Sequence, residues 1–242
     1  MRSVPIRQGA RRAGALQTAD RPLPTLNTDL LLEILEASAV IASAIAGMLI
    51  AADKRMDLIG AFALACVNAF GGGTVRDLLL DNRPFYWMAN WGYLLAILAI
   101  CIPFVYSVKA FHVAAAVHRR WVKMDAVGLA LFTVTGAGIA LEHEAPLVVA
   151  VLMGVVGGTT GGVLRDVFVN EVPDLFRPGG LYATASFAGA LAFVVALALD
   201  VNYAAAALTG VVVVVLLRVV SVRLRIGMPD PQWLAEARRH DQ

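Results

Sequence analysis

The chain has 242 residues, of which 59% are hydrophobic and only 16% are charged, and its formal net charge is +2. A soluble domain of this length has roughly a quarter of its residues charged, so the composition excludes an ordinary soluble protein. With a mean hydropathy of +0.73, the chain is expected to lie in a membrane.

Residues 1–29 contain five Arg and three Pro, and they lack the apolar stretch that a secretory signal carries behind its basic region. We therefore predict a mobile basic tail there. Seven apolar blocks follow, each close to the roughly 20 residues that a membrane-spanning helix needs. They cover residues 30–52, 57–80, 84–108, 122–141, 146–170, 177–199 and 201–221. The polar residues 222–242 are predicted to form a short cytoplasmic tail.

The blocks are predicted to be helices, because backbone groups in lipid must be satisfied within their own segment and the blocks show no alternating pattern. The predicted fold class is an all-α membrane protein with seven transmembrane helices in one domain, residues 30–221. Basic residues gather in the loops 53–56 and 109–123 and after the seventh block. The positive-inside rule then places the N-terminus outside and the C-terminus in the cytoplasm, although the tail arginines favour the opposite orientation.

The sequence aligns with itself without a gap when it is shifted by 89 residues. Arg76-Asp77 then meets Arg165-Asp166, Gly72-Gly73 meets Gly161-Gly162, and Glu36 meets Asp125. Repeat one covers residues 30–108 and repeat two covers 122–199, with three predicted spans in each. Because three is odd, the second repeat enters the membrane from the opposite side, as in many transporters and pores. The seventh helix, 201–221, lies outside the duplication.

Small residues recur every four positions in the second and fifth blocks, including Ala65, Ala69, Gly154 and Gly158. Such ladders let helix backbones approach closely, so these two helices are predicted to cross at the centre of the protomer. The glycine-rich runs 71–73 and 157–162 weaken both helices, since each interior Gly costs roughly 1 kcal/mol relative to Ala. We predict that each helix breaks there and that the freed backbone groups are buried or line a wet cavity.

The arginines that follow the glycines allow two interpretations. Arg76 and Arg165 can be interfacial residues that extend outward to the water. Alternatively, because apolar residues continue beyond them, they face a cavity or a charged partner inside the protein. A pair between Arg76 and the adjacent Asp77 requires a distorted helix, whereas symmetry also allows an exchange in which Arg76 pairs with Asp166 and Arg165 with Asp77.

Other chemistry is not indicated. The spacing of Gly157 and Gly162 resembles a phosphate loop, but Val163 and Leu164 stand where Lys and Ser or Thr are needed. The spans contain no nucleophile and base in a catalytic arrangement, so an enzyme is not expected. Cys66 and Cys101 lie inside spans and are predicted to be packing residues. We expect no catalytic residue, resident cofactor, metal site or nucleic-acid partner.

The seven spans, the two repeats and the motifs GGGTVRD at 71–77 and GGVLRD at 161–166 resemble the trimeric intracellular cation channel (TRIC) family, in its prokaryotic branch. The resemblance implies a homotrimer with one pore per protomer, lined by kinked second and fifth helices. It also implies conduction of monovalent cations, with potassium modestly favoured over sodium, and a contribution of membrane lipid to assembly. The pore and gating residues expected on this basis are Gly71, Gly72, Gly73, Thr74, Arg76, Asp77, Thr159, Thr160, Gly161, Gly162, Arg165 and Asp166.

Two other functions remain open at this point. A secondary carrier of a small solute, such as an amino acid, would use the same inverted repeat for alternating access. A membrane scaffold would use the small-residue ladders only to pack helices. Because the chain ends in RRHDQ, without a retrieval signal, the plasma (inner) membrane of a prokaryote is the expected location.

Overall fold

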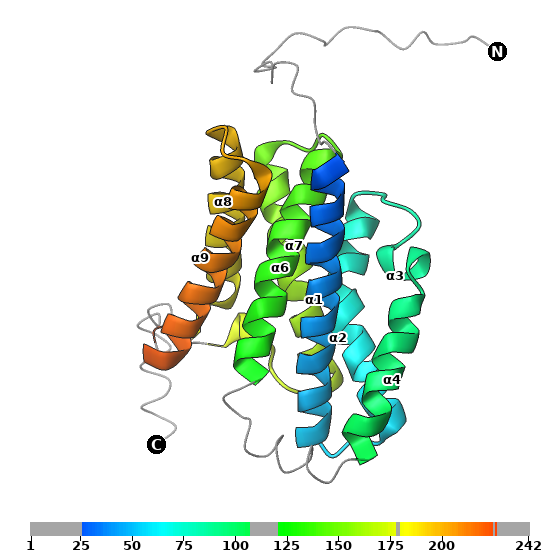
Figure 1. Cartoon of the computed structure of the whole chain (residues 1–242). Coiled ribbons are helices and arrows are strands. Elements are labelled where there is room, and N and C mark those ends of the chain that lie inside the picture. Colours follow the sequence, from blue (N-terminus) through cyan, green and yellow to red (C-terminus); the bar gives the residue numbers. More distant parts are fainter. Residues whose placement is uncertain (1–25, 107–120, 178–179, 225, 227–242) are drawn as a thin grey trace, which may run out of the picture.

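The protein is seen in a computed structural model, which describes residues 26–106, 121–177, 180–224 and 226. Within these ranges the chain forms helices and no strand, so the all-α class is confirmed (Figure 1). The α-helices are α1 (Leu26–Asp53), α2 (Leu58–Leu79), α3 (Tyr86–Ala89), α4 (Gly92–Tyr106), α6 (Trp121–Glu142), α7 (Leu147–Phe168), α8 (Tyr182–Ala198) and α9 (Tyr203–Leu224). A short 3₁₀-helix, η1 (Asp174–Phe176), lies between α7 and α8.

Five of the described helices are long and apolar enough to cross a membrane, and they are α1, α2, α6, α7 and α9. α4 and α8 are also apolar but shorter, with 15 and 17 residues. Large hydrophobic side chains such as Ile59, Val148 and Leu208 point outward, with at least 63% of their surface exposed. Apolar side chains on the outside are expected where lipid replaces water around the protein.

Two predicted spans differ from the observed helices. The third, 84–108, is divided into α3 and α4, because Asn90 leaves the helical conformation (φ −113°, ψ 50°) just before Gly92. The sixth, 177–199, begins later, at Tyr182. Gly180 precedes it with φ +102°, a conformation that an L-residue with a side chain adopts only under strain.

The predicted tails are shorter than expected where the structure describes them. α1 begins at Leu26, inside the predicted tail 1–29, and α9 runs to Leu224, beyond the predicted end at 221. Residues 1–25 and 227–242, on which the rest of both predictions falls, lie outside the described residues. The predicted loop 109–123 lies outside them up to residue 120, and α6 already begins at Trp121.

The two sequence repeats have the same local backbone. α2 and α7 have the same length, and their bounds differ by the 89 residues of the sequence shift. Left-handed residues recur at the same shift, since Arg55 (φ 54°) corresponds to Glu144 (φ 56°) and Asp81 (φ 52°) to Asn170 (φ 56°). Figure 1 shows that equivalent helices run in opposite directions, because α1 descends from the top and α6 rises from the bottom.

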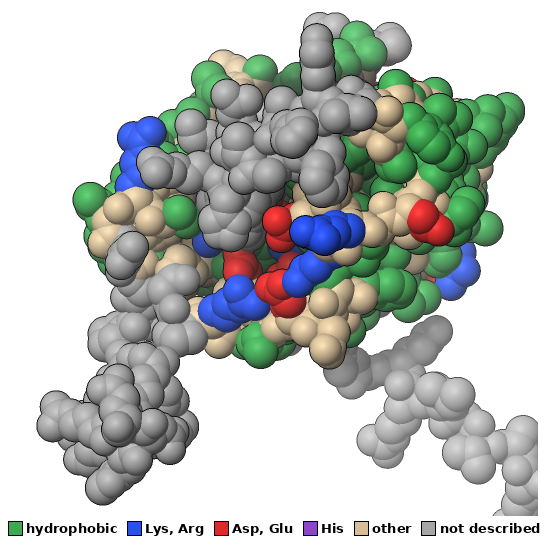
Figure 2. Space-filling model, turned by 90° about the horizontal axis from the view of Figure 1, so that it is seen from below, with side chains coloured by type: hydrophobic (Ala, Val, Ile, Leu, Met, Phe, Trp, Pro, Cys, Tyr) green, Lys and Arg blue, Asp and Glu red, His purple; other side chains and the backbone are tan. Residues whose placement is uncertain are grey.

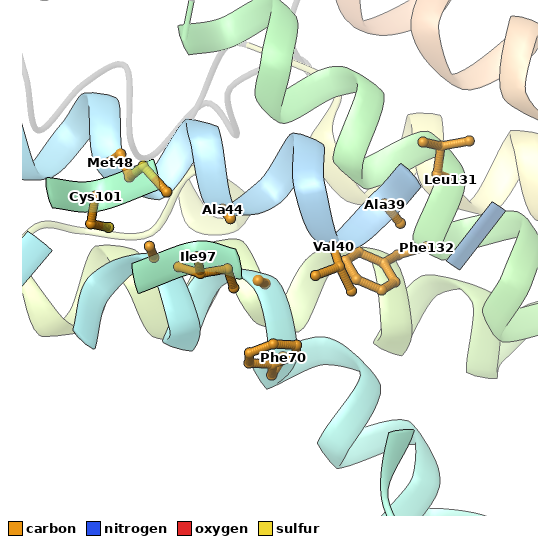
Figure 3. Close-up of a cluster of buried hydrophobic side chains, with 11 residues drawn as sticks. Ala39, Val40, Ala44, Met48, Phe70, Ile97, Cys101, Leu131 and Phe132 are labelled. Carbon is orange, nitrogen blue, oxygen red and sulfur yellow. The ribbon is translucent and has the colours of Figure 1, made fainter. Parts of the chain in front are cut away.

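The predicted breaks at the glycine runs are wrong. α2 is one helix through Gly71–Gly73, and α7 is one helix through Gly157–Gly162. The ribbon of α2 changes direction beside Phe70 in Figure 3, so the glycines allow a bend without interrupting the helix. The energetic cost of the interior glycines is offset by the packing of α2 against α7.

The core nearest to this bend joins four helices. Val40 of α1, Phe70 of α2, Ile97 of α4 and Phe132 of α6 are all buried in one hydrophobic cluster (Figure 3). α6 packs against α1, α7, α8 and α9, so it lies at the centre of the bundle.

Candidate functional site

α2 and α7 approach each other at glycines. A Cβ added to Gly72 would lie 2.1 Å from the carbonyl oxygen of Gly157, and one added to Gly161 would lie 2.5 Å from the carbonyl oxygen of Asn68. No side chain fits at either position, so the two backbones touch directly. α2 of repeat one and α7 of repeat two therefore pack directly against each other.

The residues predicted to form this contact face elsewhere. A Cβ on Gly154 would meet the carbonyl oxygen of Thr133 on α6 at 2.7 Å, and one on Gly158 would meet the Thr133 hydroxyl at 2.4 Å. Ala65 lies against Gly47 of α1. The predicted crossing of α2 with α7 is present, but Gly154 and Gly158 face α6 and Ala65 faces α1, so these three ladder residues do not make it. The sequence pattern identified close packing but not the partner helix.

A buried group of charges lies near the end of α2, and we call Glu36, Arg76 and Asp77 the upper charge cluster. Nε of Arg76 donates a hydrogen bond to Oδ1 of Asp77 at 2.8 Å, and Nη2 donates to Oε1 of Glu36 on α1, also at 2.8 Å. Oδ2 of Asp77 accepts the backbone N–H of Tyr86 at 3.4 Å. The Arg76 side chain is fully buried.

The equivalent group near the end of α7 contains more residues, and we call Asp125, Arg165, Asp166, Asp174 and Arg218 the lower charge cluster. Nε of Arg165 donates to Oδ1 of Asp166 at 2.9 Å, and its Nη1 donates to Oδ1 of Asp125 on α6. Arg218 of α9 donates from Nη2 to Oδ2 of Asp174 at 3.0 Å. The same nitrogen lies 3.9 Å from Oδ2 of Asp125.

These contacts decide between the earlier interpretations of the arginines. Arg76 and Arg165 do not extend to an interface, because both are 0% exposed. The exchange between repeats is also wrong, since each arginine pairs with the aspartate beside it and with an acid 40 residues earlier. The guanidinium is long enough to fold back over the next residue without any break in the helix.

Four members of the clusters, Glu36, Asp125, Asp174 and Arg218, were missed as site residues by sequence reasoning. Glu36 and Asp125 match each other at the 89-residue shift, which was the available signal. Arg218 stands alone in the apolar run of α9, where a basic residue is costly unless it has a partner. Its guanidinium lies 4.6 Å from the centre of the Tyr182 ring, which is a cation–π contact.

The predicted threonines serve different contacts. The hydroxyl of Thr74 accepts a hydrogen bond from Nε1 of Trp87 at 3.2 Å. The hydroxyl of Thr159 donates to the carbonyl of Val155 in the preceding turn at 2.7 Å. Thr160 is half-buried on α7. α2 and α7 are unbroken at all three threonines, so the backbone groups that were expected to be freed at the glycines stay within the helices.

A small pocket opens beside the upper charge cluster. It lies between α1, α2, α3 and α6 and combines two carboxylates with aromatic rings. Its lining residues are Glu36, Val40, Ala69, Phe70, Gly73, Thr74, Asp77, Tyr86, Trp87 and Phe132. Five of them belong to α2, so the pocket lies directly on the helix that carries the GGGTVRD motif.

The glycines nearest to the two clusters differ in their surroundings. A Cβ on Gly162 would lie 2.3 Å from the Tyr182 hydroxyl, whereas one on Gly73 would have its nearest neighbour, Nη2 of Arg76, at 3.8 Å. Gly71 is also close-packed, because its Cβ would lie 2.8 Å from Cδ1 of Leu164. Space is therefore left beside Gly73 in repeat one but filled at the equivalent position in repeat two.

Ion pairs connect the loops at the lower end of the molecule, where Figure 2 shows acidic and basic side chains together. Glu171, just after α7, accepts hydrogen bonds from Lys54 in the α1–α2 loop and from Arg177, the latter at 2.9 Å. These two bonds hold the pKa of Glu171 below its ordinary value. The lower end of the α2–α7 pair is thus tied across the two repeats by charge.

The fold and these buried charges define a class of protein. Long apolar helices with apolar outer surfaces, and ionised residues that occur in pairs inside the bundle, are the properties of a multi-pass integral membrane protein. Intramembrane charges of this kind usually mark a path for ions or polar solutes.

The particular family follows from sequence. A family profile described as glycine transporter matches residues 33–109 and again residues 122–198, and the chain belongs to that family. The two matched segments begin 89 residues apart, which is the shift at which the sequence aligns with itself. A UPF0126 membrane protein of Vibrio cholerae is 33% identical over 201 residues, which cover 82% of each chain. The UPF0126 inner membrane protein YadS of Escherichia coli K12 is 35% identical over 77% of this chain and 89% of its own.

Solved structures confirm the resemblance to TRIC channels. The trimeric intracellular cation channel orthologue from Rhodobacter sphaeroides superposes with a TM-score of 0.75 at 35% identity, over 81% of this chain and 99% of that one. A prokaryotic TRIC channel crystallised in 0.5 M KCl gives a TM-score of 0.71 at 27% identity, over 81% and 98% of the two chains.

Proposed function

We propose that this protein is a monovalent cation channel of the TRIC type, permeable to potassium. The observation that carries the proposal is the match to a solved TRIC orthologue over 99% of that chain's length at 35% identity. Together with the buried charges on α2 and α7, it favours ion conduction over a purely structural role.

In this proposal seven helices cross the membrane. The two shorter apolar helices, α4 and α8, join the five longer ones, and the two repeats insert with opposite orientation. The antiparallel directions of α1 and α6 support this layout (Figure 1). The protein assembles as a homotrimer, which the trimeric Rhodobacter channel supports, and it lies in the inner membrane, as its relative YadS does. Membrane lipid and monovalent cations are its other partners.

We place the ion path along the contact of α2 and α7 in each protomer. Arg76 lies three residues before the end of α2, and Arg165 lies three residues before the end of α7. Because α2 and α7 run in opposite directions, these arginines lie toward opposite faces of the membrane. Each pairs with buried acids, so the path presents carboxylates as well as guanidinium groups to a passing ion. Arginines alone usually favour anions, so the paired carboxylates are what make the path suitable for a cation.

Flux through reconstituted vesicles tests the proposal. Purified protein in liposomes loaded with KCl and diluted into N-methylglucamine chloride should release potassium when a protonophore provides the counter-current. Liposomes without protein are the control. Equal potassium release with and without the protein would contradict a channel.

A second function is favoured by one observation, the description of the matching family as glycine transporter. A carrier would show saturable uptake of labelled glycine and counterflow, in which unlabelled glycine inside the liposome accelerates the uptake of label. A channel does not show counterflow. The same liposomes therefore separate the two functions.

A further inference from the structure

α9 lies outside the duplication and carries a buried charge in its apolar length, on Arg218. The residue is 2% exposed, and a guanidinium inside a membrane helix is costly unless it has partners. Its Nη2 donates to Oδ2 of Asp174 in η1 at 3.0 Å and lies 3.9 Å from Oδ2 of Asp125 on α6. Its guanidinium also lies 4.6 Å from the ring centre of Tyr182 on α8. One side chain of α9 thus joins η1, α6 and α8.

The connection between α7 and α8 folds closely around this guanidinium. Gly180 has φ +102°, and a Cβ added to it would lie 2.9 Å from Nη1 of Arg218. The backbone N–H of Asp174 donates to Oδ2 of Asp166 on α7 at 3.1 Å, while the Asp174 side chain accepts from Arg218. The connection is therefore fixed on one side by α7 and on the other by α9.

Two of the residues beside Arg218 also contact α7. Asp125 accepts a hydrogen bond from Arg165 through Oδ1, the oxygen that does not face Arg218. The hydroxyl of Tyr182 fills the position beside Gly162, since a Cβ there would lie 2.3 Å from it. A displacement of Arg218 is therefore passed to α7 through both residues.

Repeat one shows the same arrangement without such an arginine. Tyr93 is the equivalent of Tyr182, and the Tyr86 ring stacks on it at a centroid distance of 5.7 Å. No atom of Tyr93 lies within 4 Å of a Cβ placed on Gly73, the glycine equivalent to the one beside Tyr182. The tyrosine thus reaches its glycine in the repeat that contacts Arg218 and does not reach it in the other.

The charges of the two clusters show that Arg218 does not correct an imbalance. Each cluster holds one more carboxylate than guanidinium groups, with two against one in the upper cluster and three against two in the lower. Phe85 stands at the position equivalent to Asp174, so Arg218 and Asp174 are added to repeat two as a neutral pair. A pair without net charge acts through the contacts that it makes.

We propose that Arg218 is a positioning residue for α7 and couples α9 to the lower end of the ion path. It holds the Tyr182 hydroxyl against Gly162, and it keeps Asp125 turned toward Arg165. Because the guanidinium moves with α9, both contacts with α7 change together when α9 shifts. The helix outside the duplication thereby sets the balance between open and closed states of a protomer. This last step rests on the proposed function, whereas the positioning of α7 does not.

Thermal unfolding of the purified full-length protein in detergent tests the positioning. The double variant Arg218→Gln, Asp174→Asn removes one charge of each sign, and Asp125 keeps its bond from Arg165. Gly162→Ala is then compared in the wild-type and the double-variant backgrounds. With Arg218 in place the Tyr182 hydroxyl cannot give way, so the loss of Tm should be larger in wild type than in the double variant by roughly 2 °C or more.

Gly138→Ala is the matched control, because its Cβ would lie 2.4 Å from another tyrosine hydroxyl, that of Tyr203. Tyr203 is the first residue of α9, roughly 22 Å along the helix from Arg218. This change should lower Tm equally in both backgrounds. Equal losses from Gly162→Ala in the two backgrounds would overturn the positioning, and so would smaller losses from both glycine changes, which indicate a general loosening.

Arg218→Lys is the conservative variant and decides the matter if the double variant does not fold. Its ammonium still pairs with Asp174 and lies over the Tyr182 ring, although it lacks the planar guanidinium. The effect of Gly162→Ala on Tm in this background should lie close to its wild-type value. Loss of the difference between Gly162→Ala and Gly138→Ala in Arg218→Lys would contradict a role that depends on the cation over the ring.

Single-channel recording in symmetric potassium chloride tests the coupling to the path. The ratio of open to closed time is expected to change by roughly two-fold to thirty-fold in the double variant and less in Arg218→Lys. Arg223→Gln, an exposed change on the same helix, should keep the wild-type ratio. An unchanged ratio in a folded, conducting double variant would overturn the coupling. Absence of current from wild type would reject the channel and with it the coupling, while the comparison of Tm still decides the positioning of α7.

Discussion

Two equivalent glycines, Gly73 and Gly162, have opposite tolerance for a side chain. A Cβ on Gly162 would lie 2.3 Å from the Tyr182 hydroxyl, which is closer than atoms in proteins pack. Gly162→Ala is therefore expected to cost about 1–3 kcal/mol, the usual range for overpacking. Gly73→Ala should be close to neutral, because its nearest neighbour would be 3.8 Å away. Thermal unfolding in detergent measures both.

The matched control for this pair is a second change that removes the clash. Tyr182→Phe deletes the hydroxyl, so the double variant Gly162→Ala, Tyr182→Phe should recover part of the lost stability. Equal destabilisation by Gly73→Ala and Gly162→Ala would show that the two glycines are needed for a shared reason, such as helix bending.

The two buried arginines are also expected to differ. Arg76→Ala leaves the carboxylates of Glu36 and Asp77 without a basic partner among the residues that the structure describes, and a broken buried pair costs about 3–5 kcal/mol. Arg165→Ala should cost less, because Arg218 remains 3.9 Å from Asp125. Stability of both variants in detergent, with size-exclusion chromatography for assembly, measures the difference. A larger loss for Arg165→Ala would contradict the compensating role of Arg218.

The sequence predicted which charged residues belong to the site better than it predicted the residues with which they form ion pairs. The doubled motif identified Arg76, Asp77, Arg165 and Asp166, and all four are buried. It did not identify Arg218, because α9 has no counterpart in the repeat and a lone residue carries no pattern. It also allowed several pairings, since the choice between them depends on how a long guanidinium side chain folds over its own helix.

At the scale of the helices, the contact of α2 with α7 depends on glycines whose Cβ positions are occupied by backbone atoms. Gly72→Ala and Gly161→Ala would place a methyl group 2.1 Å and 2.5 Å from carbonyl oxygens of the opposite helix. Backbone moves less readily than a flexible side chain, so both are expected to exceed the roughly 1–3 kcal/mol of ordinary overpacking or to block assembly.

Gly92→Ala is the control for these changes, because nothing lies within 4 Å of the added Cβ. It should leave Tm and the elution volume unchanged. If Gly72→Ala behaved like Gly92→Ala, the helices would have room to separate and the close contact would not be required for the fold.

The loops at the lower end make a contribution that depends on pH. Because bonds from Lys54 and Arg177 lower the pKa of Glu171 in the folded state, its contribution is fully present above the unfolded-state pKa. It is lost as the pH falls through the lowered folded-state value. The Glu171 side chain is 39% exposed, so screening by water limits the contribution to about 1 kcal/mol or less.

Unfolding of wild type and Glu171→Gln from neutral into acidic solution measures this contribution. The difference in Tm between them should shrink as the pH falls below the ordinary range for a glutamate. A difference that stays constant over the acidic range would mean that packing of the side chain, rather than its charge, accounts for the effect.

Helix positions were predicted from the sequence to within a few residues wherever a block was apolar and bounded by charges, as for α2 and α7. The third block was predicted as one helix because hydropathy does not register the change of backbone direction at Asn90 and Gly92. The glycine breaks were predicted from local propensity alone. Tertiary contacts of Gly72 and Gly161 override that propensity, because only glycine permits the backbones to touch.

For the whole molecule, the inverted layout predicts that equivalent loops lie on opposite sides of the membrane. Arg55 and Glu144 are exposed, left-handed residues separated by the repeat shift of 89. In a variant lacking Cys66 and Cys101, Glu144→Cys should react with an impermeant thiol reagent in intact cells, and Arg55→Cys should react only after lysis. Labelling of both in intact cells would contradict opposite sides, and the reverse pattern would overturn the predicted orientation.

The proposal that each protomer conducts cations is tested by recording from single purified trimers in a planar bilayer under a potassium chloride gradient. A homotrimer with one pore per protomer predicts unitary currents in three equally spaced levels, with a reversal potential displaced toward the equilibrium potential of potassium. The absence of unitary currents from a protein that elutes as a folded oligomer, together with glycine counterflow in liposomes, would contradict the channel and establish the carrier.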